Sequence, residues 1–222
     1  SGGQFNIPAV FRGPTGNAGQ LGAQHSQNFE NWYANTPGLK VVVPSNPYDA
    51  KGLLKTSIRD DDPVIFMESE LMYGDKGNVP EQEYLIPIGK SNIIHEGNDV
   101  TLVLFGKMMK VAEETFIEAK KENISVEVID LRSVRPIDYK SIVQSVKKTN
   151  RLVIIEEAWP LASISSEISH HIQRFAFDYL DAPVHRITCE DVPFHYAPTL
   201  IKEILPNVEK VMKAIKKVTY KN

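Results

Sequence analysis

Residues 39–67, LKVVVPSNPYDAKGLLKTSIRDDDPVIFM, contain two short apolar runs with one helical segment between them. Residues 39–43 end in three consecutive β-branched valines, which are typical of a strand buried on both faces. The prolines and polar residues at 44–47 predict a helix start, and residues 50–58 continue with apolar positions at helical spacing. Residues 64–67 are a second apolar run, so the order strand, helix, strand predicts a parallel sheet with right-handed crossovers.

The segments on either side of this unit continue the alternation. Before it, residues 7–11 predict a buried strand, and Gln24 to Asn35 a helix. After it, strands and helices alternate in the prediction at 100–105, 110–123, 126–131, 139–148, 152–155, 164–175 and 184–188, and a last helix has the inward stripe Val208, Val211, Met212 and Ile215. The predicted fold class is therefore α/β. We expect two domains, residues 1–84 and residues 85–222, connected at about residues 75–98.

The composition is that of an ordinary soluble globular protein. The 222 residues are 42% hydrophobic and 24% charged, and the net charge of −3 favours neither nucleic acid nor an anionic membrane as a partner. The single cysteine, Cys189, excludes an internal disulfide and a Cys-rich zinc site, and it fits a reducing compartment. No run approaches the roughly 18–20 apolar residues of a membrane helix. The strand at 7–11 follows Ser1 so closely that we expect the chain to begin inside a domain.

Arg12 to Ser26, RGPTGNAGQLGAQHS, is the leading candidate for a functional site. Its glycines recur at every third position and let the backbone approach a ligand closely. His25 follows them at the predicted start of a helix, where free N–H groups and partial positive charge are available. Spacing alone supports two interpretations equally: an active-site loop that presents an imidazole, and a glycine-rich turn with a capping histidine. The pattern matches no standard nucleotide-binding fingerprint.

Charged side chains near predicted element ends supply three weaker candidates. Asp60 to Asp62 form either a cation site or, as the favoured alternative, an exposed acidic helix end. Carboxylates follow two predicted strands, as the pairs Glu68 and Glu70, and Glu156 and Glu157. They suit acid–base chemistry, although a helix cap is the more common role. Arg132 and Arg135 form either an anion site or, as the favoured alternative, an interdomain or intersubunit ion pair.

A set of ordered motifs extends over essentially the whole chain. They are FRGPTG at 11–16, AQHSQ at 23–27, PGLKVVVPS at 37–45, IRDDDPV at 58–64, ESELMYG at 68–74, IPIGK at 86–90, VIDLRSVRPID at 128–138 and FDYLDAPVHRIT at 177–188. Together they resemble the beta subunits of the decarboxylating component of pyruvate dehydrogenase. The wider group includes transketolase and the branched-chain 2-oxo acid dehydrogenases, and the RGPTG and DLRSVRPID motifs favour the pyruvate type.

The resemblance implies a fold, cofactors and site residues. The fold is the C-terminal part of a pyrimidine-binding-type parallel-sheet domain, followed by an α/β domain of transketolase C-terminal type. The cofactors are thiamine diphosphate and magnesium, the latter held mainly by the alpha subunit, and the family histidine of the AQHSQ motif is His25. The family also has a potassium site made largely of backbone carbonyls. By resemblance its residues are Ala9, Ser57, Ile58, Asp60 and Asp62.

The implied reaction is oxidative decarboxylation of pyruvate with reductive acetylation of lipoyl. Its implied partners are the alpha subunit, in an α2β2 tetramer, and the lipoyl-bearing acetyltransferase core. Alternatives are a branched-chain or acetoin type of enzyme and, in another class, a non-catalytic assembly or docking module. A bacterial cytoplasm is the favoured location, with the mitochondrial matrix or a plastid for an organellar source.

The chain also departs from the family pattern. The glutamate that contacts the cofactor's pyrimidine ring in relatives lies upstream of Ser1, so the chain resembles a C-terminal fragment without a cofactor-binding residue of its own. We therefore expect the isolated chain to be inactive. His195 stands where relatives usually have proline, and Ala158 where they usually have glycine. Both departures fall in loops of the second domain and leave the assignment intact.

Overall fold

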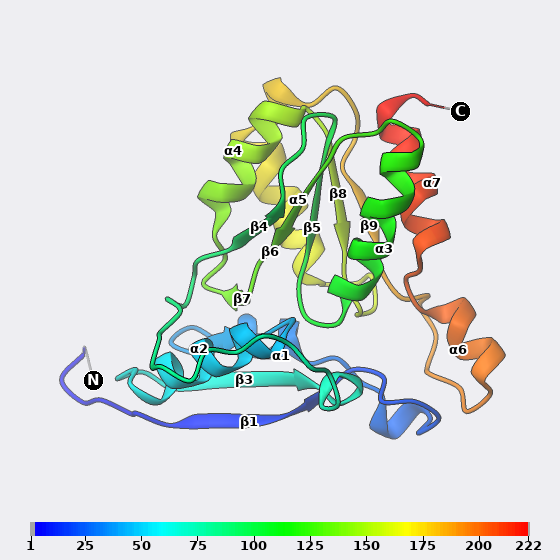
Figure 1. The fold of residues 1–222 in the computed structure, drawn as a ribbon. Helices are drawn as coiled ribbons and strands as arrows, with labels where there is room; N and C mark the ends of the chain where they lie inside the picture. Colours follow the sequence, from blue (N-terminus) through cyan, green and yellow to red (C-terminus); the bar gives the residue numbers. More distant parts are fainter. Residues whose placement is uncertain (1–2, 222) are drawn as a thin grey trace.

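Two α/β units, each built on its own sheet, make up residues 3–221, which are the residues that the computed structural model describes (Figure 1). The first sheet has the strand order β1-β3-β2-β7. Strands β1 (Val10–Thr15), β3 (Val64–Ser69) and β2 (Lys40–Val42) run parallel to one another. Helix α2 (Pro47–Ile58) connects β2 to β3. The predicted strand–helix–strand unit is therefore confirmed.

Helix α2 begins where the sequence predicts. The side chain of Asn46 accepts a hydrogen bond from the backbone N–H of Asp49 at 2.8 Å, and Pro47 occupies the first turn. Such a cap satisfies a backbone donor that has no partner within the helix. The helix then buries Leu53 against Phe66 of β3. Local capping and a periodic apolar face therefore determine this element.

Strand β1 is displaced from its predicted position at 7–11. It runs through the Gly-Pro pair, with Gly13 beside Met67 and Pro14 beside Glu68 of β3. Pro14 is tolerated because β1 is an edge strand, where a missing N–H interrupts no ladder on the open side.

The second sheet has the order β4-β6-β5-β8-β9. Its strands are β4 (Asn92–His95), β5 (Val100–Leu104), β6 (Val126–Asp130), β8 (Leu152–Ile155) and β9 (His185–Ile187). All are parallel except β4, which pairs antiparallel with β6. Strand β4 lies in the segment that the sequence predicts as a connection. The parallel centre of the sheet agrees with the prediction.

Helices cover both faces of the second sheet (Figure 1). Helices α3 (Met108–Lys121) and α7 (Val208–Thr219) share one apolar cluster with the sheet. Helices α4 (Tyr139–Thr149) and α5 (Ile164–Phe175) share the cluster on the other side. A short helix, α6 (Pro198–Ile204), precedes α7. The covered faces explain why β5, β6 and β8 are buried along their whole length.

One strand of the second unit belongs to the first sheet. Strand β7 (Ser133–Arg135) follows β6 in the chain but pairs antiparallel with β2. The N–H of Val43 donates to the carbonyl of Arg132 at 2.9 Å beside this pairing. Val43 also lies in the same buried cluster as Leu131 and the inner side chains of α4 and α5. The two units therefore share a strand and an apolar core.

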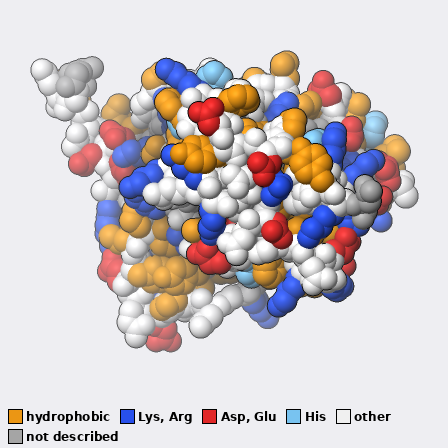
Figure 2. Space-filling model, turned by 90° about the horizontal axis from the view of Figure 1, so that it is seen from above, with side chains coloured by type: hydrophobic (Ala, Val, Ile, Leu, Met, Phe, Trp, Pro, Cys, Tyr) orange, Lys and Arg blue, Asp and Glu red, His pale blue; other side chains and the backbone are white. Residues whose placement is uncertain are grey.

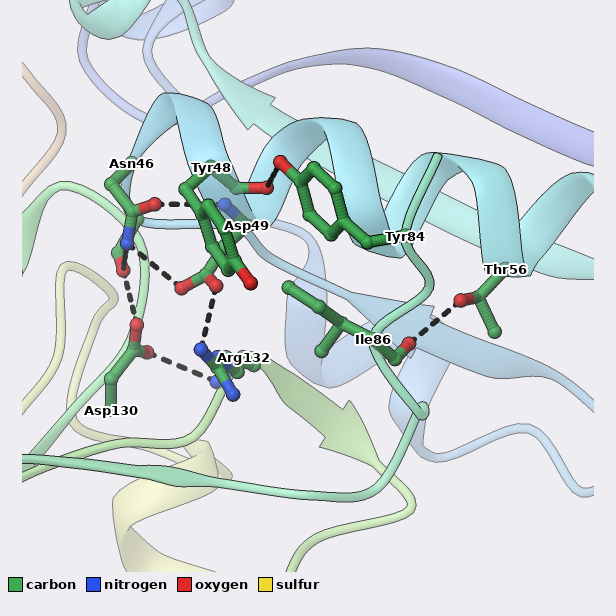
Figure 3. Close-up of polar contacts among 9 residues, drawn as sticks. Asn46, Tyr48, Asp49, Thr56, Tyr84, Ile86, Asp130 and Arg132 are labelled. Atoms are coloured by element: carbon green, nitrogen blue, oxygen red, sulfur yellow. Dashed lines mark hydrogen bonds and ion pairs between the residues drawn. The ribbon is translucent and has the colours of Figure 1, made fainter. Parts of the chain in front are cut away.

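Polar contacts complete the junction between the units (Figure 3). The guanidinium of Arg132 lies 2.7 Å from a carboxylate oxygen of Asp49 on α2, and the Arg132 N–H donates to Asp130 at 3.0 Å. The guanidinium of Arg135 donates to the carbonyl of Ala34 at 3.0 Å. The favoured interpretation of Arg132, an interdomain ion pair, is confirmed.

On the face of the described surface seen in Figure 2, neither positive nor negative charge predominates. Acidic and basic side chains are interspersed there, in keeping with the net charge of −3. Within residues 3–221, no helix combines the length and the apolar character needed to cross a bilayer.

Asp130 is a fully buried acid at the junction. Its side chain is fully buried and accepts a hydrogen bond from the hydroxyl of Ser45. Burial raises the pKa of Asp130 to about 7, although the Ser45 hydroxyl and the Arg132 N–H act in the opposite direction.

Asp130→Asn should remove a pH dependence from the stability of the fold. Because its folded-state pKa lies above the unfolded value, protonated Asp130 stabilises the fold at low pH. This contribution, on the order of 4 kcal/mol, is complete below the unfolded pKa of about 4 and is lost as the pH rises through the folded-state pKa of about 7. The free energy of unfolding of the wild type should therefore fall over this window relative to D130N. Urea titrations at several pH values measure it, with the exposed Asp178→Asn as control; parallel pH curves for wild type and D130N would refute the assignment.

Candidate functional site

The glycine-rich segment forms a closed loop at the carboxyl end of β1. The N–H of Gly16 donates to the carbonyl of Gln27 at 2.9 Å, which joins the two ends of the loop. Gly16, Gly19 and Gly22 have positive φ angles of 79°, 119° and 72°, in the left-handed region that favours glycine. Gly13, the first of the four periodic glycines, lies inside β1 instead.

His25 ends a single 3₁₀ turn, η1 (Ala23–His25), and its side chain is exposed. The helix predicted from Gln24 begins later, as α1 (Glu30–Ala34), so that prediction is wrong at its start. The reason is that Gln27 uses its carbonyl to close the loop rather than to begin a helix. His25 therefore does not cap α1, and the loop presents its imidazole toward solvent.

A cleft of about 260 Å³ opens beside the imidazole. Its lining comes from the end of β1, the glycine loop and the start of η2 (Glu70–Met72): Pro14, Thr15, Gly16, Leu21, Gln24, His25, Gln27, Phe29 and Glu70. The carboxyl ends of β1 and β3 meet here, which is where open parallel sheets place their ligands. Within residues 3–221 no hydrogen bond joins His25 to Glu70. Both side chains are therefore available to a ligand in the cleft.

The other carboxylates near strand ends have structural partners. Glu68 forms an ion pair with Arg12 at 2.6 Å, and this contact raises the pKa of the Arg12 guanidinium. Glu156 accepts the backbone N–H groups of Ile164 at 2.9 Å and Ser165 at 2.7 Å, at the start of α5. The helix-cap alternative is therefore confirmed for Glu156.

A buried ion pair lies beneath the glycine loop, and sequence analysis did not identify it. The ammonium of Lys107 is 2.6 Å from a carboxylate oxygen of Glu157. The same carboxylate accepts the N–H of Asn17 at 2.8 Å, and Lys107 donates to the carbonyl of Asn17 at 2.8 Å. The available signal was position, because Lys107 follows a predicted strand just after Gly106. Of the two residues, the sequence analysis named only Glu157, as one of two carboxylates that follow a predicted strand.

Glu30 is a second buried acid near this pair. Its side chain is about 4% exposed and accepts a hydrogen bond from the hydroxyl of Thr15 at 3.0 Å. Burial raises the pKa of Glu30 to about 7, against the smaller effect of the Thr15 hydrogen bond. Glu30 and Lys107 line the same narrow pocket between the units.

An aromatic ring from the second unit covers the outer part of the loop. A side chain at Gly22 would overlap the ring of Tyr196, and the Tyr196 hydroxyl lies 3.4 Å from the side-chain oxygen of Gln24. His195, which stands where relatives usually have proline, precedes Tyr196 in the chain and is exposed. The loop therefore contacts the second unit at both its base and its tip.

The residues of the predicted potassium site lie in two segments, the one before β1 and the end of α2 with the turn that follows it. The N–H of Ile7 donates to the carbonyl of Asp61 at 3.0 Å, and the N–H of Val64 donates to the carbonyl of Ala9 at 2.9 Å. The segment that leads into β1 therefore lies against the turn after α2.

The acidic character of this turn has its own partner in the protein. The ammonium of Lys40 lies 2.6 Å from Asp60 and 3.1 Å from Asp62. These contacts lower the pKa of Asp60 against the effect of its partial burial. Within residues 3–221, no group of three or more His, Cys, Asp or Glu side chains is arranged to bind a metal. The potassium site stays a prediction that rests on backbone carbonyls.

Comparisons with known proteins agree with this architecture. A family model described as the transketolase pyrimidine-binding domain matches residues 1–76, and one described as the transketolase C-terminal domain matches residues 89–211. A solved structure described as a split-gene transketolase, an inactive beta4 tetramer, superposes with a TM-score of 0.81. It covers 97% of this chain and 67% of that chain at 20% identity, so it supports the fold alone.

Curated relatives narrow the family. Pyruvate dehydrogenase E1 component beta subunits are 50% identical over 222 residues in Rhizobium meliloti and 48% identical over 220 residues in Rickettsia felis. A mitochondrial beta-1 subunit of this component from Oryza sativa is 48% identical over 225 residues. The chain spans 48%, 68% and 60% of these three relatives, and they span 99% or more of it. The chain belongs to the pyruvate dehydrogenase E1 beta subunit family of transketolase-like proteins.

Proposed function

We propose that this chain forms the His25-bearing part of a pyruvate dehydrogenase beta subunit. The reaction is oxidative decarboxylation of pyruvate with reductive acetylation of lipoyl. The observation that carries the proposal is sequence identity of about half, sustained over the whole chain, with beta subunits of that component. The exposed imidazole in a cleft at the carboxyl ends of β1 and β3 supports it from the structure.

His25 is the proposed catalytic residue. An imidazole gives or takes a proton near neutral pH at either ring nitrogen, which suits transfer of an acyl group to a thiol. Glu70 lines the same cleft and supplies a carboxylate that can orient a polar group of the substrate. Pro14, Leu21 and Phe29 supply apolar surface that excludes water from the reacting groups.

Thiamine diphosphate is the proposed cofactor. When bound, it supplies the electron sink that makes loss of carbon dioxide from a 2-oxo acid possible. The cleft of about 260 Å³ is smaller than the roughly 300–1,000 Å³ of pockets that enclose a drug-sized ligand. The apolar lining beside His25 fits contact with part of the group. We therefore assign the diphosphate and its magnesium to the alpha subunit, which completes the site.

Further polypeptide is proposed to cover the open edge of the first sheet. Among residues 3–221, β1 pairs only with β3, so no described strand covers its other edge. The side chains of Phe11 and Trp32 are 61% and 69% exposed nearby, and a groove runs between β1 and Tyr33 of α1. An open strand edge beside exposed aromatic rings favours association. We propose that the part of the subunit outside the matched segment covers this face, and that the alpha subunit and the acetyltransferase core bind the assembled subunit.

The proposed location is the bacterial cytoplasm, with the mitochondrial matrix or a plastid as alternatives. Relatives include both bacterial and mitochondrial proteins. A single buried cysteine, Cys189, suits the reducing conditions of these compartments.

Substrate choice tests the proposed function directly. The full-length beta subunit is produced with its alpha partner and assayed with pyruvate and with branched-chain 2-oxo acids. We expect kcat/KM for pyruvate to exceed the branched-chain value by at least about tenfold, because one or two extra methylene-sized groups are worth that much in a fitted pocket. The 222-residue chain alone serves as the inactive control. A preference for branched-chain acids would overturn the substrate assignment.

His25→Gln should lower the rate of lipoyl acetylation in the assembled enzyme. Loss of a positioned proton donor or acceptor typically costs about 10²–10⁴ in kcat. His170→Gln is the matched control, because His170 is exposed on α5 and outside the cleft. Steady-state kinetics with a free lipoyl domain measures both variants. Equal loss in the two variants, or none in H25Q, would remove His25 from the mechanism.

Potassium should raise the thermal stability of the first unit. A bound ion between the carbonyls near Ala9 and those near Ile58 and Asp60 would hold the strand before the glycine loop against α2. Melting in potassium chloride is compared with melting in sodium and choline chlorides at equal ionic strength. An ion of the wrong size coordinates poorly at a rigid site, so only potassium should raise the melting temperature. Identical melting curves in the three salts would exclude the site.

A further inference from the structure

The carboxyl ends of two strands in the second sheet point at the His25 loop. Lys107 follows β5, and Glu157 follows β8. Their side chains are 9% and 7% exposed, and they form an ion pair of 2.6 Å at the junction. Asn17, the second residue of the loop, is their shared partner in the first unit.

Both backbone groups of Asn17 are held by this pair. Its N–H donates to Glu157 at 2.8 Å, and its carbonyl accepts from Lys107 at 2.8 Å. Hydrogen bonds to ionised partners are about twice as strong as neutral ones, and burial excludes competing water. The N–H and the carbonyl of one residue belong to the two peptide groups on either side of its Cα, so holding both restricts φ and ψ of Asn17. Asn17 is therefore an anchor for the loop.

The anchor extends toward His25 by short steps. The side-chain oxygen of Asn17 accepts the N–H of Gly19 at 3.0 Å. On the other side, Gly16 bonds to Gln27, which is two residues beyond His25. A Cβ on Gly16 would approach Glu157 Oε1 to 3.0 Å, so the loop lies directly on the carboxylate. Both ends of the loop are therefore fixed at one point of the junction.

We propose that Lys107 and Glu157 are positioning residues that hold the His25 loop in its working geometry. We call the contacts of Lys107 and Glu157 with Asn17 the loop clamp. Its effect on catalysis rests on the proposed function. Through the clamp, the second unit supports the His25 site without contacting the substrate. Removing one partner of such a pair leaves the other charge buried without compensation. The loop should therefore leave its position rather than adjust slightly.

Hydrogen–deuterium exchange of the full-length subunit, assembled with its alpha partner, tests the clamp without requiring turnover. Lys107→Met removes the charge and the hydrogen-bond donor while keeping a long, unbranched side chain. We expect amide exchange in residues 16–28 to accelerate at least about tenfold, with exchange in β5 and β6 unchanged. Lys107→Arg, which keeps the charge and the donors, should restore protection. Lys110→Met is the matched control, because Lys110 forms an exposed ion pair with Asp75 across the same junction.

Glu157→Gln decides the case if Lys107→Met does not fold. It keeps an acceptor for the Asn17 N–H but removes the charge, so a smaller acceleration, about threefold, is expected in residues 16–28. In both variants kcat should fall together with loop protection, and K107R should recover both. Wild-type exchange in residues 16–28 in K107M or E157Q would overturn the proposal. Faster exchange throughout the second unit, or no recovery in K107R, would also overturn it.

Discussion

Charges buried between the two sheets need charged or polar partners there, and this requirement determines how the units sit on each other. Arg132 of the second unit meets Asp49 of the first, and Lys107 with Glu157 meets the backbone of Asn17. Removing one partner of such a buried pair typically costs about 3–5 kcal/mol, because the other charge stays desolvated. Each pair therefore acts as a directional constraint that apolar packing alone would not supply.

Apolar packing at the same junction is continuous. Strand β7 enters the first sheet, and one cluster includes Val43 of the first unit together with Leu131 and Ile154 of the second. The units consequently cannot slide past each other without exposing core side chains. The polar pairs select one orientation, while the shared core makes that orientation stable. The polar pairs and the shared core together place the carboxyl ends of both sheets toward the same loop.

The His25 site is composite for that reason. Its cleft is lined by the first unit, through β1, the glycine loop and Glu70. The loop itself is held by Lys107 and Glu157 of the second unit and covered by Tyr196. A side chain presented on a loop needs this kind of support, because a glycine-rich backbone has many accessible conformations. The C-terminal unit thus acts on the site through geometry, at positions where its own strands end.

Sequence by itself determined the elements whose cause is local. The start of α2, its apolar face and the buried runs of β5, β6 and β8 depend on neighbours within a few residues, and all were predictable. Motif order identified the family and singled out His25. Tertiary structure alone decided the late start of α1, the transfer of β7, the pairing of Lys40 with Asp60, and the clamp on Asn17. These features join residues far apart in the chain, and no periodic pattern records which distant charges and strands will meet when the sheets pack.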